Sequence, residues 1–171
     1  MNLIHAPGYS IRVVTPPSSE TAPRSEIEIA GAPTGKFVQG AVLEAALKWN
    51  NYLLLFLTDD IPFEEGLNIY LLDGNLDVVD SAQMYHIYST GVFSDLDLTQ
   101  ADTARFRFFA EVVWTLQLFP QKVFALPILS DPIGVHRPFG FFRMFKIYRR
   151  SVPDLGKDET AVAATVSLGD G

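Results

Sequence analysis

The sequence contains no cysteine, so it offers no disulfide, no thiolate zinc site and no cysteine nucleophile. It also lacks a long hydrophobic run. The longest apolar stretch, 52–57, is far shorter than the roughly 20 residues that cross a bilayer. The first residues, MNLIHAPGYS, have neither a basic start nor a long apolar run, so they do not fit a secretory signal. These absences predict a cytoplasmic protein that does not enter the membrane.

Motifs that define a reaction or a ligand are also missing. There is no G-x-S-x-G elbow for a serine nucleophile and no H-E-x-x-H pair for zinc. We therefore expect no metal and no cofactor, and we favour a non-enzymatic protein.

Positive charge is scarce. The 13 Lys and Arg are outnumbered by 20 Asp and Glu, which gives a net charge of −7 at pH 7. Such a chain repels phosphate backbones, so we do not expect nucleic-acid binding. Negative charge also keeps proteins soluble, so it does not by itself define a partner.

Aromatic and aliphatic residues are abundant. A chain of 171 residues with 48% hydrophobic content suits one globular domain. Its 13 Phe, 6 Tyr and 2 Trp favour an interior built from sheets. We assign 1–152 to a single β-rich domain, with an irregular portion at 1–36 that contains short strands, and 153–171 to a flexible C-terminal tail.

The clearest strand pattern lies between Arg105 and Phe119. Apolar residues occupy every second position, namely Phe106, Phe108, Ala110, Val112, Trp114, Leu116 and Leu118. A period of two predicts a strand. Because this run is longer than the usual strand of about 5–6 residues, we expect a bulge or tight turn near Ala110-Glu111.

Residues 41–58 fit a hairpin that turns at Asn50-Asn51, since asparagine tolerates positive φ. That turn would pair Trp49 with Tyr52, Leu47 with Leu54 and Ala45 with Phe56. A helix over 40–49 remains an alternative, because Glu44 and Lys48 form an i,i+4 pair.

The stretch LLDGNLDVVD (71–80) poses a choice between a calcium loop and a hairpin turn. An EF-hand loop that starts at Asp73 needs Gly and Glu where this chain has Val78 and Met84. Asp73-Gly74 instead predicts a type I′ turn, because this dipeptide accepts positive φ at both central residues. The expected register places Leu71 opposite Leu76 and Ile69 opposite Val78.

These patterns together predict an all-β fold, either an antiparallel β-sandwich or a partly open barrel of about 8–10 short strands, with at most one or two short helices. Residues 9–14 and 25–30 alternate like strands, and Pro16-Pro17 restricts its neighbourhood to a loop or a sheet edge. Residues 139–150 fit either a helix or a strand, and we prefer the strand.

The first candidate binding segment is the acidic loop TDDIPFEEG (58–66). Asp59, Asp60, Glu64 and Glu65 fall within it, and Asp60 could cap a helical turn that begins at Pro62. A solvated loop is the ordinary interpretation. Its concentrated charge still makes it the best contact for a basic partner.

The second candidate segment is HRPFGFFRMFKIYRR (136–150). His136 and Arg137 stand in a loop, where functional residues collect. Arg143 follows in a stretch where cations interleave with aromatics, as they do in single-stranded nucleic-acid platforms. A core strand flanked by solvated cations has the same composition, and we prefer that interpretation.

The sequence therefore predicts an acidic, non-enzymatic module that binds another protein, with the charge character of an inhibitor or immunity protein. The expected contact residues are Asp59, Asp60, Glu64, Glu65, His136, Arg137 and Arg143. One alternative is a small-molecule-binding barrel or hydrolase with a pocket in its mouth, to which His86 would also contribute. Another is a structural subunit whose edge strand pairs with a neighbour, as in a homo-oligomer.

Overall fold

Alternating apolar side chains build three antiparallel sheets. The computed structural model describes residues 1–18, 20–61, 64–85, 91–109, 112–127 and 129–150. Within these ranges it contains strands and no helix, and its sheets do not close into a barrel. The predicted all-β class is confirmed, and the sandwich is the correct choice. His86, the Ala110-Glu111 pair and the predicted tail at 153–171 lie outside the described residues.

The central layer is a six-stranded sheet (sheet A) in the order β1-β5-β6-β7-β8-β12. Its strands are β1 (Ile4–His5), β5 (Val42–Trp49), β6 (Tyr52–Thr58), β7 (Leu67–Leu72), β8 (Val78–Met84) and β12 (Val135–His136). β5 excludes the helix over 40–49.

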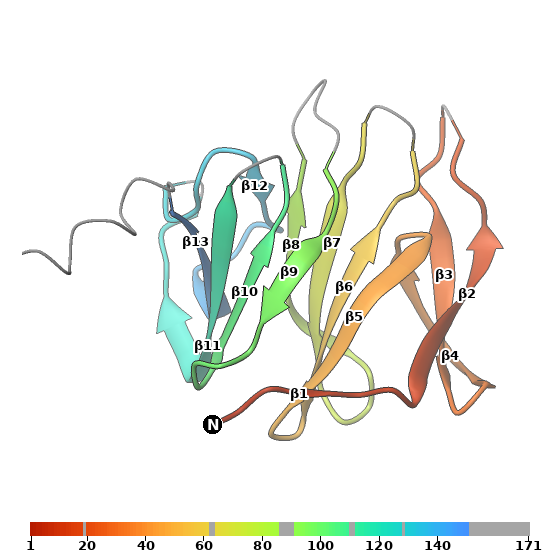
Figure 1. Cartoon of the computed structure of the whole chain (residues 1–171), viewed down its shortest axis with the longest axis horizontal. Helices are drawn as coiled ribbons and strands as arrows, with labels where there is room; N and C mark the ends of the chain where they lie inside the picture. The colour runs from red at the N-terminus through yellow and green to blue at the C-terminus, as the bar shows by residue number, and fades with distance from the viewer. Residues whose placement is uncertain (19, 62–63, 86–90, 110–111, 128, 151–171) are drawn as a thin grey trace, which may run out of the picture.

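A four-stranded sheet (sheet C) covers one face of sheet A, in the order β13-β11-β10-β9 (Figure 1). Its strands are β9 (Ser94–Asp97), β10 (Thr103–Arg107), β11 (Val113–Phe124) and β13 (Phe142–Arg150). The main core fills the space between the two sheets. Phe56, Ile69 and Met84 of sheet A meet Phe106, Leu116 and Phe145 of sheet C, and all are fully buried. β13 confirms the preferred strand over 139–150.

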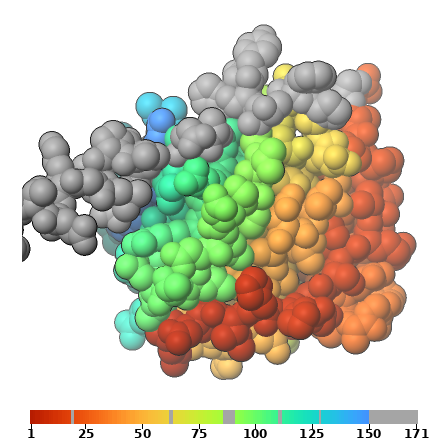
Figure 2. Space-filling model, viewed as in Figure 1, coloured from red at the N-terminus to blue at the C-terminus, as the bar shows by residue number. Residues whose placement is uncertain are grey.

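A three-stranded sheet (sheet B) packs on the other face of sheet A, in the order β2-β3-β4. Its strands are β2 (Tyr9–Thr15), β3 (Arg24–Ile29) and β4 (Ala32–Gln39). Ile27 and Val38 of sheet B pack against Leu53, Leu55 and Leu57 of β6. These three residues alternate along β6 with Leu54 and Phe56, which face the main core. Figure 1 shows the resulting three layers, and Figure 2 shows the N-terminal segment lying across one end of the molecule.

The described residues contain thirteen strands, more than the 8–10 expected. Two of the additional strands, β1 and β12, hold only two residues each and carry no readable alternation. β4 begins at Ala32, in a stretch that holds Pro33 and Gly35, two residue types that interrupt most strands. It lies at the edge of sheet B, where Pro33 is tolerated, and Gly35 has a φ of 72° beside a register shift.

Two hairpins test the predicted registers. In β5–β6 the pairs Trp49–Tyr52, Leu47–Leu54 and Ala45–Phe56 are all present, so this prediction is confirmed. In β7–β8 the hairpin is correct but its register is wrong, because Leu71 faces Asp80 and Leu72 faces Val78. The connection holds five residues, 73–77, where a type I′ turn has two, and Leu76 takes the positive φ of 60°.

The long alternating run at 105–119 divides into β10 and β11, which pair antiparallel with Phe106 opposite Trp114. The chain therefore reverses direction between Arg107 and Val113.

Candidate functional site

The long connection between β11 and β13 (125–141) carries β12 and is fixed to the fold by Arg137. The side chain of Arg137 is 2% exposed, and its guanidinium reaches three elements. Nε donates to Asp131 Oδ1 at 2.8 Å, Nη1 contacts Asp80 Oδ1 at 3.3 Å, and Nη2 donates to the carbonyl of Phe145 at 3.1 Å. The guanidinium carbon also lies 4.3 Å from the centre of the Phe145 ring. Arg137 therefore ties the connection to sheet A and to sheet C.

Asp80 completes this anchor from β8. Its Oδ2 accepts the backbone N–H groups of Met144 at 2.7 Å and Phe145 at 3.3 Å, so a carboxylate of sheet A caps the outer edge of β13. Burial lowers the pKa of the Arg137 guanidinium, while the charges of Asp80 and Asp131 oppose that shift. The connection is a braced element, because each buried charge has a partner of opposite sign.

Apolar side chains on and beside this connection face solvent. We define the aromatic patch as Phe124, Ile133, Phe139, Phe141 and Phe142. Ile133 is 87% exposed and Phe139 is 79% exposed. The Phe124 and Phe141 rings stack at 6.2 Å, and Phe139 meets Phe141 edge-on at 5.4 Å, so the rings form one surface. Leu126 and Leu129 of the same connection are also exposed.

A hollow of about 510 Å³ opens beside the patch. Ile133 and Phe139 line it together with Pro127, Pro132 and Val135. Arg143 forms part of its wall and donates to the carbonyl of Pro138 at 2.8 Å. Its size and apolar lining suit the insertion of a side chain from a partner.

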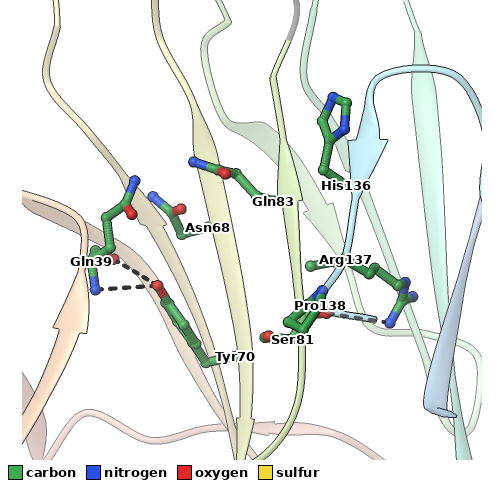
Figure 3. Close-up of a pocket in the computed structure, with 9 residues that line it drawn as sticks. Gln39, Asn68, Tyr70, Ser81, Gln83, His136, Arg137 and Pro138 are labelled. Carbon is green, nitrogen blue, oxygen red and sulfur yellow. Dashed lines mark hydrogen bonds between the residues drawn. The ribbon is translucent and has the colours of Figure 1, made fainter. Parts of the chain in front are cut away.

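A second concavity, the polar groove, lies on the other side of β12 (Figure 3). Its volume is about 290 Å³, and Asn68, Tyr70, Ser81 and Gln83 of β7 and β8 form its floor. Gln39 at the end of β4 and His136 of β12 stand on opposite sides of it. His136, Arg137 and Pro138 line both concavities, so β12 and the residues after it form a wall between them.

The acidic loop contacts residues of the polar groove through Asp59. Asn68 Nδ2 donates to Asp59 Oδ1 at 2.7 Å. Asp59 is only 5% exposed, and burial raises the pKa of its carboxyl, although hydrogen bonds from Asn68 and Gln39 oppose the rise. Gly66 makes room for it, since a Cβ there would lie 2.7 Å from Asp59 Oδ2.

Glu65 holds the start of the acidic loop. Its Oε1 accepts the N–H of Asp59 at 2.7 Å and of Asp60 at 2.9 Å. Burial raises the pKa of the Glu65 carboxyl, and these two hydrogen bonds oppose the rise. Asp60 has a φ of 56°. The helical turn predicted to begin at Pro62 lies outside the described residues. The side chains of Asp60 and Glu64 are exposed.

The structure thus divides the seven predicted contact residues. Asp60, Glu64 and His136 are exposed, and Glu65 is half-buried. Asp59, Arg137 and Arg143 have buried side chains with partners inside the fold, so they shape the surface rather than form it. Asp59 meets Asn68 at one end of the groove, and His136 lines the opposite side.

Sequence reasoning missed the patch and the groove floor. The signal for the patch was present in the aromatic residues of 139–142, which were assigned to a core strand. No signal marked Asn68, Ser81 and Gln83, since polar residues that alternate along a strand normally face water.

No family model matches the sequence, and no curated protein or solved structure is similar to it at a significant level. No helix capable of crossing a membrane occurs in the described part of the chain. In the same part, no group of three or more His, Asp or Glu side chains is placed to hold a metal ion.

Proposed function

We propose that this protein is a non-enzymatic module that binds another protein through the aromatic patch. The exposure of Ile133 and Phe139 on a braced connection carries the proposal. Soluble proteins rarely expose adjoining large apolar side chains unless these form an interface. Aromatic anchors inserted next to a preformed hollow are the usual source of binding energy in such interfaces.

The charge around the patch indicates the chemistry of the partner. Lys122 is exposed two residues before Phe124, and Arg143 lines the hollow, although the whole chain has a net charge of −7. Arg137 is already paired with Asp80 and Asp131. We infer a partner segment with apolar anchors and acidic neighbours. A second copy of this chain fits less well, because a two-fold contact would bring these cations together.

The test is selection of random peptides displayed on phage against the immobilised protein. We expect enriched peptides that combine aromatic and acidic residues. They should bind the variant I133S/F139S at least about tenfold more weakly, a loss of roughly 1.4 kcal/mol. The control variant I4S/V92S removes two exposed apolar side chains outside the patch, and it should bind like the parent protein.

Three results would contradict the proposal: no enrichment, equal binding to I133S/F139S, or a stable dimer that this variant abolishes. Binding of the parent protein, but not of the variant, to phosphatidylcholine–phosphatidylglycerol vesicles would assign the patch to a membrane instead. The selected peptides could instead be basic, and bind to I133S/F139S but not to D60N/E64Q. That result would assign binding to the acidic loop.

A further inference from the structure

The polar groove is separate from the aromatic patch, since no residue of the patch lines it. Sheet B covers the outer face of sheet A over β5, β6 and part of β7, where that face is apolar. Beyond this cover the same face turns polar at Asn68, Ser81 and Gln83, and the polar groove runs between the end of β4 and β12. The groove therefore differs from the rest of this sheet face, which is apolar and covered by sheet B.

The groove presents carboxamide, hydroxyl and imidazole groups that can form hydrogen bonds. Figure 3 shows the carboxamides of Gln39, Asn68 and Gln83 and the imidazole of His136 gathered around one space. The guanidinium of Arg137 points away from them, toward the partners described above. The carboxylate of Asp59 does not line the groove and accepts a hydrogen bond from Asn68. A phosphate or a carboxylate ligand would find no free cation in this lining.

The lining is held in place before any ligand arrives. Tyr70 Oη accepts the N–H of Gln39 at 3.2 Å and donates to the Gln39 carbonyl at 3.3 Å. Burial raises the pKa of Tyr70 to about 12, so its hydroxyl keeps its proton at neutral pH. Asp59 fixes one end of the Asn68 amide. Sites built on strands with such supports bind with little reorganisation.

We propose that the polar groove binds one ring of a neutral saccharide. Sugar hydroxyls donate and accept hydrogen bonds, which matches a lining of carboxamide, hydroxyl and imidazole groups. The volume of about 290 Å³ is near the lower limit for ligand pockets, about 300 Å³, and so suits one ring. An extended peptide fits less well, because it needs a strand edge and pockets for alternate side chains. The floor here is the face of a sheet, and the only aliphatic residues that line the groove are Ala82 and Pro138.

The test is titration of the ¹⁵N-labelled protein with glucose, galactose, mannose and N-acetylglucosamine, each at millimolar concentration, followed by amide NMR. At least one sugar should shift the amides of Asn68, Ser81 and Gln83 saturably. Q83A and S81A should each weaken that binding several-fold. The control Q117A removes an exposed carboxamide from β11 of sheet C and should change nothing.

The proposal is overturned if no sugar shifts these amides, if Q83A and S81A both bind like the parent protein, or if sodium phosphate or trialanine binds there in place of the sugars. I133S/F139S should bind the sugar normally, since neither residue lines the groove. Failure of one proposal can therefore be told from failure of the other.

Discussion

At the scale of single residues, Arg137 fixes the connection that carries the aromatic patch. Its replacement in R137M would leave Asp80 and Asp131 without their cation, with the Asp80 side chain buried at 3% exposed. Removing one partner of a buried pair typically costs about 3–5 kcal/mol, so we expect a loss of that size in the free energy of unfolding. Urea denaturation measures it.

The matched control for this prediction is K36M, which breaks the ion pair between Lys36 and Asp77, whose side chains are 39% and 62% exposed. Exposed pairs contribute at most about 1 kcal/mol. Similar losses for R137M and K36M would show that Arg137 does not brace the connection.

Asp59 makes stability depend on pH. Burial raises the pKa of this carboxyl above its unfolded value of 3.8, so the folded state binds its proton more tightly. Its contribution is therefore present at low pH and is lost as pH rises from 3.8 through the folded pKa. D59N removes the titrating group. We therefore expect the free energy of unfolding to fall less between pH 4 and pH 7 in D59N than in the parent protein.

Asp97 provides a comparison of opposite sign. Hydrogen bonds from Thr99 lower the pKa of its carboxyl, so its contribution is lost as pH falls below 3.8. D97N should therefore flatten the stability profile between pH 4 and pH 2. Unfolding curves for D59N and D97N from pH 2 to 7 test both directions, and equal profiles would contradict the argument.

Position 66 requires glycine because Asp59 lies close to its Cα. G66A would place a methyl group 2.7 Å from Asp59 Oδ2, and the carboxylate would have to leave Asn68. Overpacking of this kind costs about 1–3 kcal/mol. Gly74 has nothing within 4 Å of its Cβ position, so G74A should stay within about 0.5 kcal/mol of the parent protein. Thermal or urea unfolding compares the two.

At the scale of elements, the β5–β6 hairpin was predictable next to its turn, because a two-residue turn at Asn50-Asn51 fixes the pairs from Trp49–Tyr52 to Ala45–Phe56. The register shift that follows between Ala45 and Leu43 was not predicted. Asn50 has a φ of 55°, which a β-branched residue adopts at a cost of roughly 1–2 kcal/mol. We expect N50V to destabilise the protein by that amount in urea, and N50G to be nearly neutral. N51V is the control, since Asn51 does not have positive φ, and an equal loss there would contradict the turn assignment.

The β7–β8 register was not predictable, because a side chain decides it. Asp73 Oδ1 accepts the N–H groups of Asn75 at 2.9 Å and Asp77 at 3.0 Å, which supports a five-residue connection at 73–77 instead of a two-residue turn. Asp73-Gly74 is compatible with either turn. β4 was missed for a related reason, since Pro33 and Gly35 break a central strand but are tolerated at an edge.

At the scale of the whole molecule, alternation predicts the sheets but not how they are layered. Ile69 and Tyr70 point to opposite faces of β7, and both faces are covered, one by sheet C and one in part by sheet B. The sequence also could not place Arg137, because its partners Asp80 and Phe145 come from separate sheets. The burial of Arg137 depends on residues that are distant in the sequence. Charge patterning alone therefore predicted that it lies at the surface.

The central claim is that the braced connection at 125–141 presents a surface for another protein. Amide NMR of the labelled protein with a selected peptide tests it most directly. The claim predicts shifts at the described amides of 124–142, with those of Asp60, Glu64 and Gln83 unchanged. Shifts confined to the acidic loop or to the polar groove, with the patch amides unmoved, would contradict it.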